Sequence, residues 1–61
     1  MVKVGDFIKI VVMAGEPQYS GMTGVVRTID DKGQLHGSWG SLAVQPENDE
    51  FEILENTEAV K

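Results

Sequence analysis

The stretch Gly21-Met22-Thr23-Gly24-Val25-Val26 decides the fold, because it places two glycines three residues apart and directly before β-branched residues. Glycine accommodates the backbone angles of a sharp turn, whereas valine, isoleucine and threonine favour extended strands. The apolar run Phe7–Met13 precedes this stretch, and a segment rich in glycine, proline and serine lies between the two. The pattern predicts a strand, a loop without helix and a sharp turn into a second strand, as in a small and strongly bent β-sheet.

Alternation and turn residues divide the rest of the chain into further short strands. In the first strand, alternation places Ile8, Ile10 and Val12 on one face. Asp31-Lys32-Gly33 predicts a hairpin with its glycine in a left-handed conformation. Proline followed by acidic residues over 46–49 predicts a single helical turn. The predicted strands cover residues 7–13, 24–30, 34–39, 42–45 and 50–54.

Five short strands and no long helix predict an all-β domain, a small five-stranded SH3-like barrel with one helical turn before the last strand. The barrel is expected over residues 1–54, with a polar and frayed tail over 55–61. Gly37 lies in mid-strand, where a glycine allows sharp bending or the close packing of a large ring such as Trp39. The predicted core consists of Ile8, Ile10, Val12, Val25, Ile29, Leu35, Trp39, Leu42, Val44, Phe51 and Ile53.

Size and composition exclude several classes of function. A chain of 61 residues forms one domain with a thin core, which leaves no room for an enclosed active site. There is no cysteine and a single histidine, so we expect no disulfide, no metal site and no cofactor. No apolar stretch approaches the roughly 20 residues of a membrane span, and the N-terminus has no signal-peptide layout. We therefore expect a soluble, cytoplasmic protein without a membrane partner.

The charge distribution is uneven. The net charge is −5, and it comes entirely from residues 33–61, because the charges of residues 1–32 sum to zero. Proteins that bind nucleic acid draw most of their affinity from lysine and arginine side chains that neutralise phosphates. The balance disfavours direct nucleic-acid binding, and it leaves open a local patch built from Lys9, Arg27 and Lys32.

The turn-and-strand stretch at residues 21–26 resembles the signature of KOW-type barrels, which occur in ribosomal proteins and transcription elongation factors. A longer likeness is to an uncharacterised family of small bacterial, phage and mobile-element proteins that carry the pattern VDD-x-G-x-I-H-V-x-W-D-N-G-S-x-L. It extends over residues 4–54 and includes Val4-Gly5-Asp6, Ile29-Asp30-Asp31-x-Gly33-Gln34-Leu35-His36, Trp39, Gly40-Ser41-Leu42, Pro46 and Asp49-x-Phe51.

This resemblance implies the barrel fold and a phage or mobile-element origin, and it implies no activity. The chain departs from the family in one hairpin. The family's Trp-Asp-Asn-Gly-Ser is here Trp39-Gly40-Ser41, two residues shorter, so the role of the longer tip does not transfer.

Few residues suggest chemistry. Tyr19 lies in the loop that helps to bind proline-rich peptides in SH3 domains, but such a groove needs several stacked aromatic side chains and this chain has four in all. His36 is predicted on the strand face opposite Leu35, exposed to solvent. No nucleophile and base stand at a recognisable spacing, so no catalytic residue is predicted. Asp30-Asp31 with Gly33 fits a turn better than a calcium loop, whose further oxygen ligands are missing.

The acidic run from Glu47 to Glu58 contains six carboxylates in twelve residues. It has two interpretations: a solvated edge strand whose charges discourage aggregation, or a docking surface for a basic protein. The predicted partner-binding residues are Tyr19, His36, Glu47, Asp49, Glu50 and Glu52.

From the residues and the resemblance we expect a non-enzymatic protein-interaction module, an accessory protein of a phage or mobile element with a protein partner. The alternatives are a KOW-like nucleic-acid-associated module and an acidic inhibitor that mimics nucleic acid and blocks a host DNA-binding or defence enzyme. The identity of the partner and the oligomeric state stay open at this point.

Overall fold

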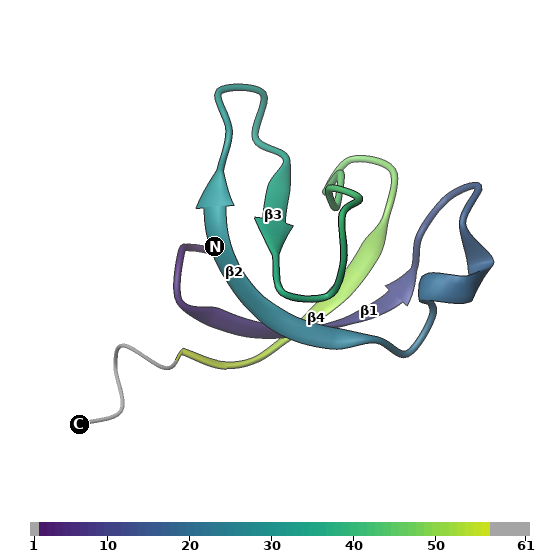
Figure 1. Ribbon diagram of the computed structural model, residues 1–61, viewed down its shortest axis with the longest axis horizontal. Coiled ribbons are helices and arrows are strands. Elements are labelled where there is room, and N and C mark those ends of the chain that lie inside the picture. The colour runs from purple at the N-terminus through teal and green to yellow at the C-terminus, as the bar shows by residue number, and fades with distance from the viewer. Residues whose placement is uncertain (1, 57–61) are drawn as a thin grey trace.

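One sheet of four antiparallel strands, in the order β3-β2-β1-β4, forms the framework of the protein (Figure 1). The computed structural model describes residues 2–56. A single 3-10 turn, η1, follows the first strand. The elements are β1 (Asp6–Val12), η1 (Pro17–Tyr19), β2 (Thr23–Ile29), β3 (Leu35–Gly37) and β4 (Glu50–Asn56).

Strand β2 is shared by both halves of the sheet. Its first residues pair with β1, with Val25 opposite Phe7, and its last residues pair with β3, with Ile29 opposite Leu35. Figure 1 shows that β2 curves strongly between these two partners. A register shift between Val26 and Thr28 lies within the curve, as expected because bulges increase the local twist and bend of a strand.

The two glycines of the 21–24 stretch have different roles. Gly21 adopts a φ of +89°, and its amide donates to the carbonyl of Ile10 at 2.7 Å, so it forms the turn into β2. Gly24 already lies within β2 and is buried. A Cβ atom on Gly24 would lie 2.8 Å from the backbone nitrogen of Trp39, so this position requires glycine for close packing. The predicted turn followed by a strand is confirmed.

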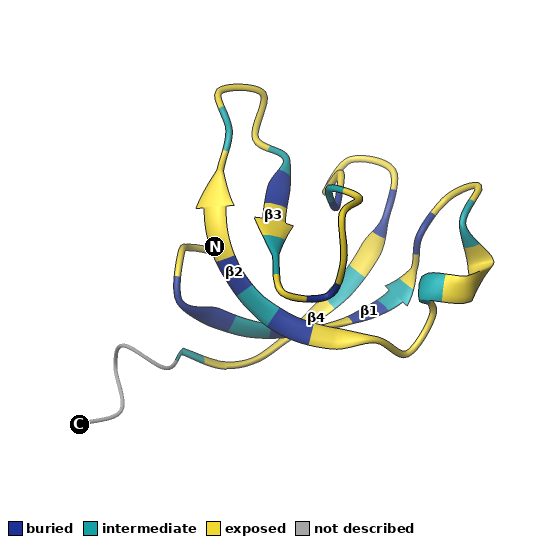
Figure 2. Cartoon of the chain, viewed as in Figure 1, coloured by how far each residue is buried: buried dark blue, intermediate teal, exposed yellow. Residues whose placement is uncertain are grey.

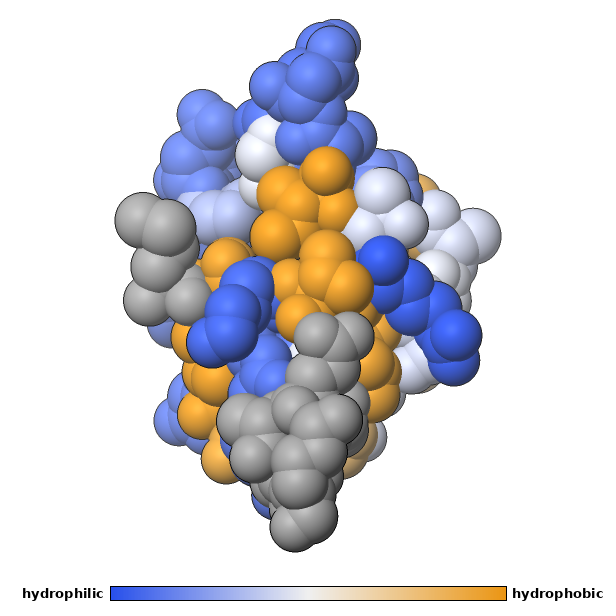
Figure 3. Space-filling model, turned by 90° about the vertical axis from the view of Figure 1, so that its left-hand side faces the viewer, coloured by the Kyte–Doolittle hydropathy of each residue, from blue (hydrophilic) through white to orange (hydrophobic). Residues whose placement is uncertain are grey.

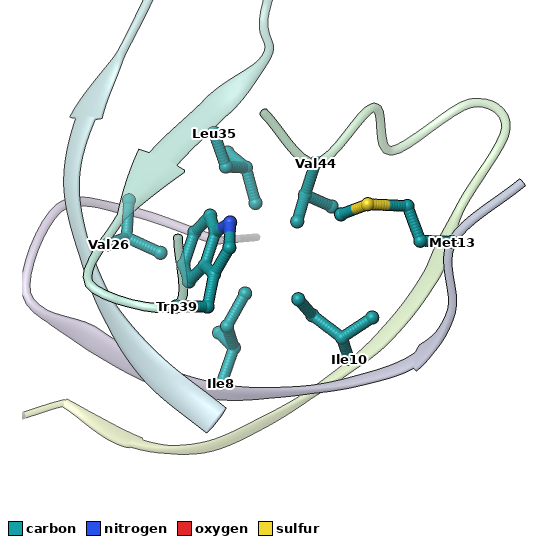
Figure 4. Close-up of a cluster of buried hydrophobic side chains, with 7 residues drawn as sticks. All are labelled: Ile8, Ile10, Met13, Val26, Leu35, Trp39 and Val44. Carbon is teal, nitrogen blue, oxygen red and sulfur yellow. The ribbon is translucent and has the colours of Figure 1, made fainter. Parts of the chain in front are cut away.

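The core lies in the concave side of the bent sheet, where the indole of Trp39 is surrounded by aliphatic side chains (Figures 2 and 4). Its Nε1 donates to the carbonyl of Leu42 at 2.8 Å. A Cβ atom on Gly37 would lie 2.5 Å from Cζ3 of Trp39, which confirms the predicted close packing of glycine and ring. The buried apolar residues are Ile8, Ile10, Met13, Val26, Leu35, Trp39 and Val44.

The predicted core was wrong at several positions, and the register explains two of them. A shift between Ile10 and Val12 in the pairing of β1 with β4 reverses the alternation, so that Val12 is 48% exposed and Met13 is buried. In β2 the inward residue is Val26, and Val25 is only partly buried. The other predicted core residues that lie nearer the surface are Ile29, Leu42 and Ile53, whereas Phe51 is partly buried and packs against the core cluster as predicted.

The prediction of five strands in a closed barrel was also wrong. The segment 42–45 contributes only one bridge, between Val44 and Leu35. Two backbone groups of this segment bond to side chains and not to a neighbouring strand. The carbonyl of Leu42 accepts from the Trp39 indole, and the amide of Gln45 donates to the Asp49 carboxylate. Within residues 2–56, β3 and β4 do not pair, and the sheet stays open.

One of the two helical segments was predicted and the other was not. Residues 46–49 form the predicted single turn, in which the amides of Asn48 and Asp49 donate to the carbonyl of Gln45, the second with the four-residue spacing of an α-helix. The only 3-10 turn of the described chain is η1, which lies in the segment expected to be a loop without helix. Pro17 stands in the first turn of η1, a position that suits its fixed φ.

The last strand extends further than expected. β4 continues through Asn56, whose side-chain amide donates to the Asp6 carboxylate at 2.6 Å. Asp6 is 2% exposed and also accepts from the Lys3 amide at 2.8 Å, so it joins the N-terminal turn to the end of β4. Residues 55 and 56 therefore belong to the sheet, and the rest of the predicted tail, residues 57–61, lies outside the described residues.

Candidate functional site

The most distinctive surface of the molecule is the acidic edge, which we define as Glu47, Glu50, Glu52 and Glu55. The last three lie on β4, the final strand in the sheet order, and all four are exposed. On the neighbouring strand, Glu50 faces Val12 and Glu52 faces Lys9. One cation therefore stands opposite these carboxylates on β1, and the negative charge of β4 is mostly uncompensated there.

Apolar side chains accompany the carboxylates on β4. Ile53 is 46% exposed although it pairs with Ile8, which is completely buried. Leu54 is 48% exposed. Because residues paired across strands share a face, Ile53 continues the core-facing side of the sheet beyond the buried core to its rim. Around Glu52 and Ile53, β4 thus carries a carboxylate on one face and an apolar side chain on the other.

Asp49 was predicted as a partner-binding residue, but it is only 7% exposed. Its Oδ1 accepts from the amide of Ala14 and its Oδ2 accepts from the amide of Gln45, both at 2.8 Å. These bonds tie the loop after β1 to the turn before β4. The carboxylate positions the start of the acidic edge and does not contribute to its surface.

Tyr19 ends η1 and is half-buried against the core cluster. Its ring also lies against Gly40, where a Cβ atom would be 2.8 Å from the tyrosine hydroxyl. Gly40 has a φ of +154°, so both space and backbone favour glycine beside this ring. Tyr19 therefore packs η1 onto the segment that follows Trp39.

His36 is exposed on β3, as predicted, and its Nε2 lies 3.0 Å from Oδ2 of Asp30. The other carboxylate oxygen of Asp30 accepts from the amides of Lys32 and Gln34, both at 2.9 Å. The hydrogen bond from His36, and then that from the Gln34 amide, lower the pKa of Asp30. With Gly33 at a φ of +82°, these contacts confirm the predicted turn and left-handed glycine.

The structure does not bring the predicted site residues together. Tyr19 belongs to η1, which contacts β1 among the described elements, while His36 lies on β3, which contacts β2. The acidic edge lies on the opposite side of β1 from β2. Three separate places on the surface therefore carry these side chains.

The basic residues of the nucleic-acid alternative are also dispersed. Lys9 faces Glu52 on one side and Thr23 on the other. Arg27 lies four residues along β2 from Thr23, a separation of about 13 Å in an extended strand. Lys32 is at the tip of the hairpin between β2 and β3. The three residues therefore lie on β1, on β2 and at the tip of the hairpin that follows β2.

Other surface features are less specific. A hollow of about 510 Å³ opens between the loop after β1 and the segment 42–49, and Met13, Gln34 and Asn48 contribute to its lining. Figure 3 shows apolar surface on the side where the N-terminal segment and β2 lie, with polar side chains around it. Large apolar residues at least 36% exposed are Val4, Val12, Met22, Ile29, Leu42, Ile53 and Leu54.

Residues 2–56 contain no group of three or more histidine, cysteine or acidic side chains that could hold a metal ion. Within the same range, no helix is long and apolar enough to cross a membrane.

Comparison with protein-family models, curated proteins and solved structures found no match to this chain.

Sequence reasoning missed the apolar part of the acidic edge. It assigned Ile53 to the core on alternation alone, and it placed Leu54 at the strand end without a role. The signal that could have found them is the sequence Glu52-Ile53-Leu54-Glu55, in which two large apolar residues lie between carboxylates in a strand at the end of the domain.

Proposed function

We propose that this chain is a non-enzymatic protein-interaction module that binds a basic protein partner through the acidic edge. One observation carries the proposal: an edge strand presents exposed glutamates together with exposed Ile53 and Leu54. A negative patch accelerates encounter with a positive partner, and exposed apolar side chains beside it supply contact area.

The competing interpretation is that the glutamates only keep the edge strand soluble. A strand protected in this way needs charge and has no need of large apolar side chains on its surface. Ile53 and Leu54 are each almost half exposed, which opposes solubility and favours contact. The combination therefore favours a docking surface.

The fold proposal is an open form of an SH3-like barrel. The strongly curved β2, shared by β1 and β3, and the bridge that Val44 makes with Leu35 support this interpretation. The phage or mobile-element origin and the cytoplasmic location stay predictions from the sequence. The KOW-like alternative is weakened by the separation of Lys9, Arg27 and Lys32, and the acidic inhibitor is a special case in which the basic partner is a nucleic-acid enzyme.

A capture experiment with matched variants tests the proposal. The chain is immobilised and exposed to lysate of its host, and bound proteins are identified and then purified for titration. The test variant is Glu50→Gln/Glu52→Gln, and the control is Glu16→Gln/Asp31→Asn, which removes two charges outside the acidic edge. We expect one or more basic proteins to bind wild type and the control alike, and the test variant at least fivefold more weakly.

Equal binding of a purified partner by both variants would refute the acidic edge as the docking surface. A second arm titrates labelled single- and double-stranded DNA and RNA at low salt, where phosphate contacts are strongest. Micromolar binding to nucleic acid that is lost in Lys9→Gln/Arg27→Gln would replace the proposal with the nucleic-acid-associated module.

A further inference from the structure

The backbone of β4 offers unpaired groups at its outer side. Ile10 directs its amide and carbonyl toward β2, where they bond Met22 and Gly21. Successive residues of a strand direct these groups to opposite sides, so Lys9 directs its own toward β4 and its partner Glu52. The residues on either side of Glu52, Phe51 and Ile53, then direct their amides and carbonyls to the open edge.

The side chains along this edge alternate in chemistry. Phe51 and Ile53 pair with Ile10 and Ile8, so they lie on the core-facing side of the sheet. Glu50 and Glu52 lie on the opposite face, and both are exposed. A strand added beside β4 would therefore meet apolar side chains on one face and carboxylates on the other.

The charge of β4 distinguishes two strands that could pair with this edge, β4 of a second copy and a basic segment of a partner. In an antiparallel pair of β4 strands from two copies, the sheet would continue with the same faces together, so glutamates would face glutamates. Like charges directly opposite one another destabilise a strand pair. A strand that places lysine or arginine opposite Glu50 and Glu52 is instead stabilised by attraction between opposite charges. The edge is therefore complementary to a basic segment and not to a second copy of β4.

We propose that the open edge of β4 binds an extended segment of the partner protein by antiparallel strand addition, and that this segment alternates apolar with basic residues. The added strand would bond the backbone of Phe51 and Ile53, cover the exposed side of Ile53 and pair its cations with Glu50 and Glu52. Strand addition is a general mode of peptide recognition in which backbone bonds give affinity and alternate side chains give specificity. This inference rests on the proposed function and specifies the form of the partner.

The test uses the full chain and an acetylated and amidated eight-residue peptide of alternating lysine and valine. Amide shifts of the ¹⁵N-labelled protein give both the location and the dissociation constant. We expect the largest shifts at Phe51, Ile53 and their neighbours, and about fivefold weaker binding by Glu50→Gln/Glu52→Gln but not by Glu16→Gln/Asp31→Asn.

Two modified peptides separate strand addition from attraction between charges. In the proposed antiparallel pairing the valines lie opposite Phe51 and Ile53 and share their hydrogen bonds, whereas the lysine amides point away from β4. Methylation of two valine nitrogens should weaken binding at least tenfold, and methylation of two lysine nitrogens should change it less than twofold. Equal binding by both would refute strand addition while the acidic docking surface stands.

The remaining outcomes are equally decisive. If Glu50→Gln/Glu52→Gln binds the unmodified peptide as well as wild type does, the charge complementarity fails, and with it the proposed function. If the amides of Phe51 and Ile53 broaden with protein concentration in the absence of peptide, and sedimentation gives a dimer, the edge belongs to a second copy. Shifts that are largest at residues 13–16 or 42–49 would place the peptide in the surface hollow and overturn the proposal.

Discussion

Replacing Gly37 by alanine should unfold much of the protein, because the added methyl group has no space. Its Cβ would lie 2.3 Å from the carbonyl oxygen of Val25, 2.5 Å from Cζ3 of Trp39 and 2.8 Å from Cη2. Carbon atoms in contact normally stay about 3.5–4.0 Å apart. Two rigid groups therefore have to move, one of them backbone of the strand that pairs with β3.

The magnitude follows from these contacts. Overpacking a core with one methylene costs about 1–3 kcal/mol and occasionally more. Because backbone and a buried ring obstruct the methyl group together, we expect a loss of about 3 kcal/mol or more. A 61-residue domain has a total stability of about 3–9 kcal/mol at the usual stability per residue. The substitution should remove a third or more of it.

Urea denaturation followed by Trp39 fluorescence measures this loss, since Trp39 is the only tryptophan and is 3% exposed. The control is Gly33→Ala, where nothing lies within 4 Å of the Cβ position and only the φ of +82° is unfavourable. We expect Gly33→Ala to lower the free energy of unfolding by about 1–2 kcal/mol, the usual cost of a left-handed conformation for a residue other than glycine. A loss at Gly37→Ala no greater than at Gly33→Ala would refute the reasoning.

A double-mutant cycle separates the two obstacles. Trp39→Phe removes the outer ring atoms of the indole, so Gly37→Ala should cost less in that background, and circular dichroism replaces fluorescence as the readout. The cost that persists reports the contact with the Val25 carbonyl. If Gly37→Ala costs the same in both backgrounds, the indole is not the obstacle.

Further predictions concern the buried and hairpin carboxylates. The hydrogen bond from Asn56, and then that from the Lys3 amide, lower the pKa of Asp6. The ionised carboxylate therefore stabilises the folded protein fully above about pH 4. This stabilisation is lost as the pH falls through the lowered pKa, because the unfolded chain binds the proton more tightly. In chemical denaturation between pH 2 and 6, the free energy of unfolding should therefore depend less on pH for Asp6→Asn than for wild type. Asp49→Ala should lower the free energy of unfolding by about 1–3 kcal/mol, because it leaves two amides unpaired. The control Asp31→Ala should change it by no more than about 0.5 kcal/mol from wild type, and urea denaturation measures both. Asp30→Ala should lower the thermal midpoint more than His36→Ala does, because it removes two amide partners as well as the histidine contact.

The sequence predicted the features that depend on near neighbours. Gly33 follows two residues that favour a tight hairpin, and Gly37 stands two residues before Trp39. Both glycines have the expected roles. The inward face of β1 was also predicted through Ile10, since alternation within one strand is sufficient to place Ile8 and Ile10 together.

Pairing between distant segments explains the errors. The alternation of β1 changes after Ile10 because β4 pairs there with one residue fewer, and nothing within Phe7–Met13 announces this shift. Gly24 was assigned to the start of the strand, without a burial role, and only the approach of Trp39 shows why Val26 faces inward with it. Both errors concern contacts between residues more than ten positions apart.

The missing strand has a local cause, and it shapes the candidate site. The residues of 42–45 suit a strand, but side chains of Trp39 and Asp49 take the backbone groups of Leu42 and Gln45. The sequence identified Asp49 as a surface charge because it stands among glutamates. Its two bonds to amides instead stabilise a turn at the position where a fifth strand could have continued, and the sheet stays open beside β4.

The two interpretations of the acidic residues then become one. In the free protein, Glu50 and Glu52 oppose the pairing of β4 with a second copy, because equal charges would stand side by side. Toward a basic strand the same carboxylates are attractive. Neutralising them should therefore have two opposite effects, in that Glu50→Gln/Glu52→Gln binds a basic segment more weakly and self-associates more strongly. A surface that was only solvated would lose solubility without any change in the binding of a basic segment.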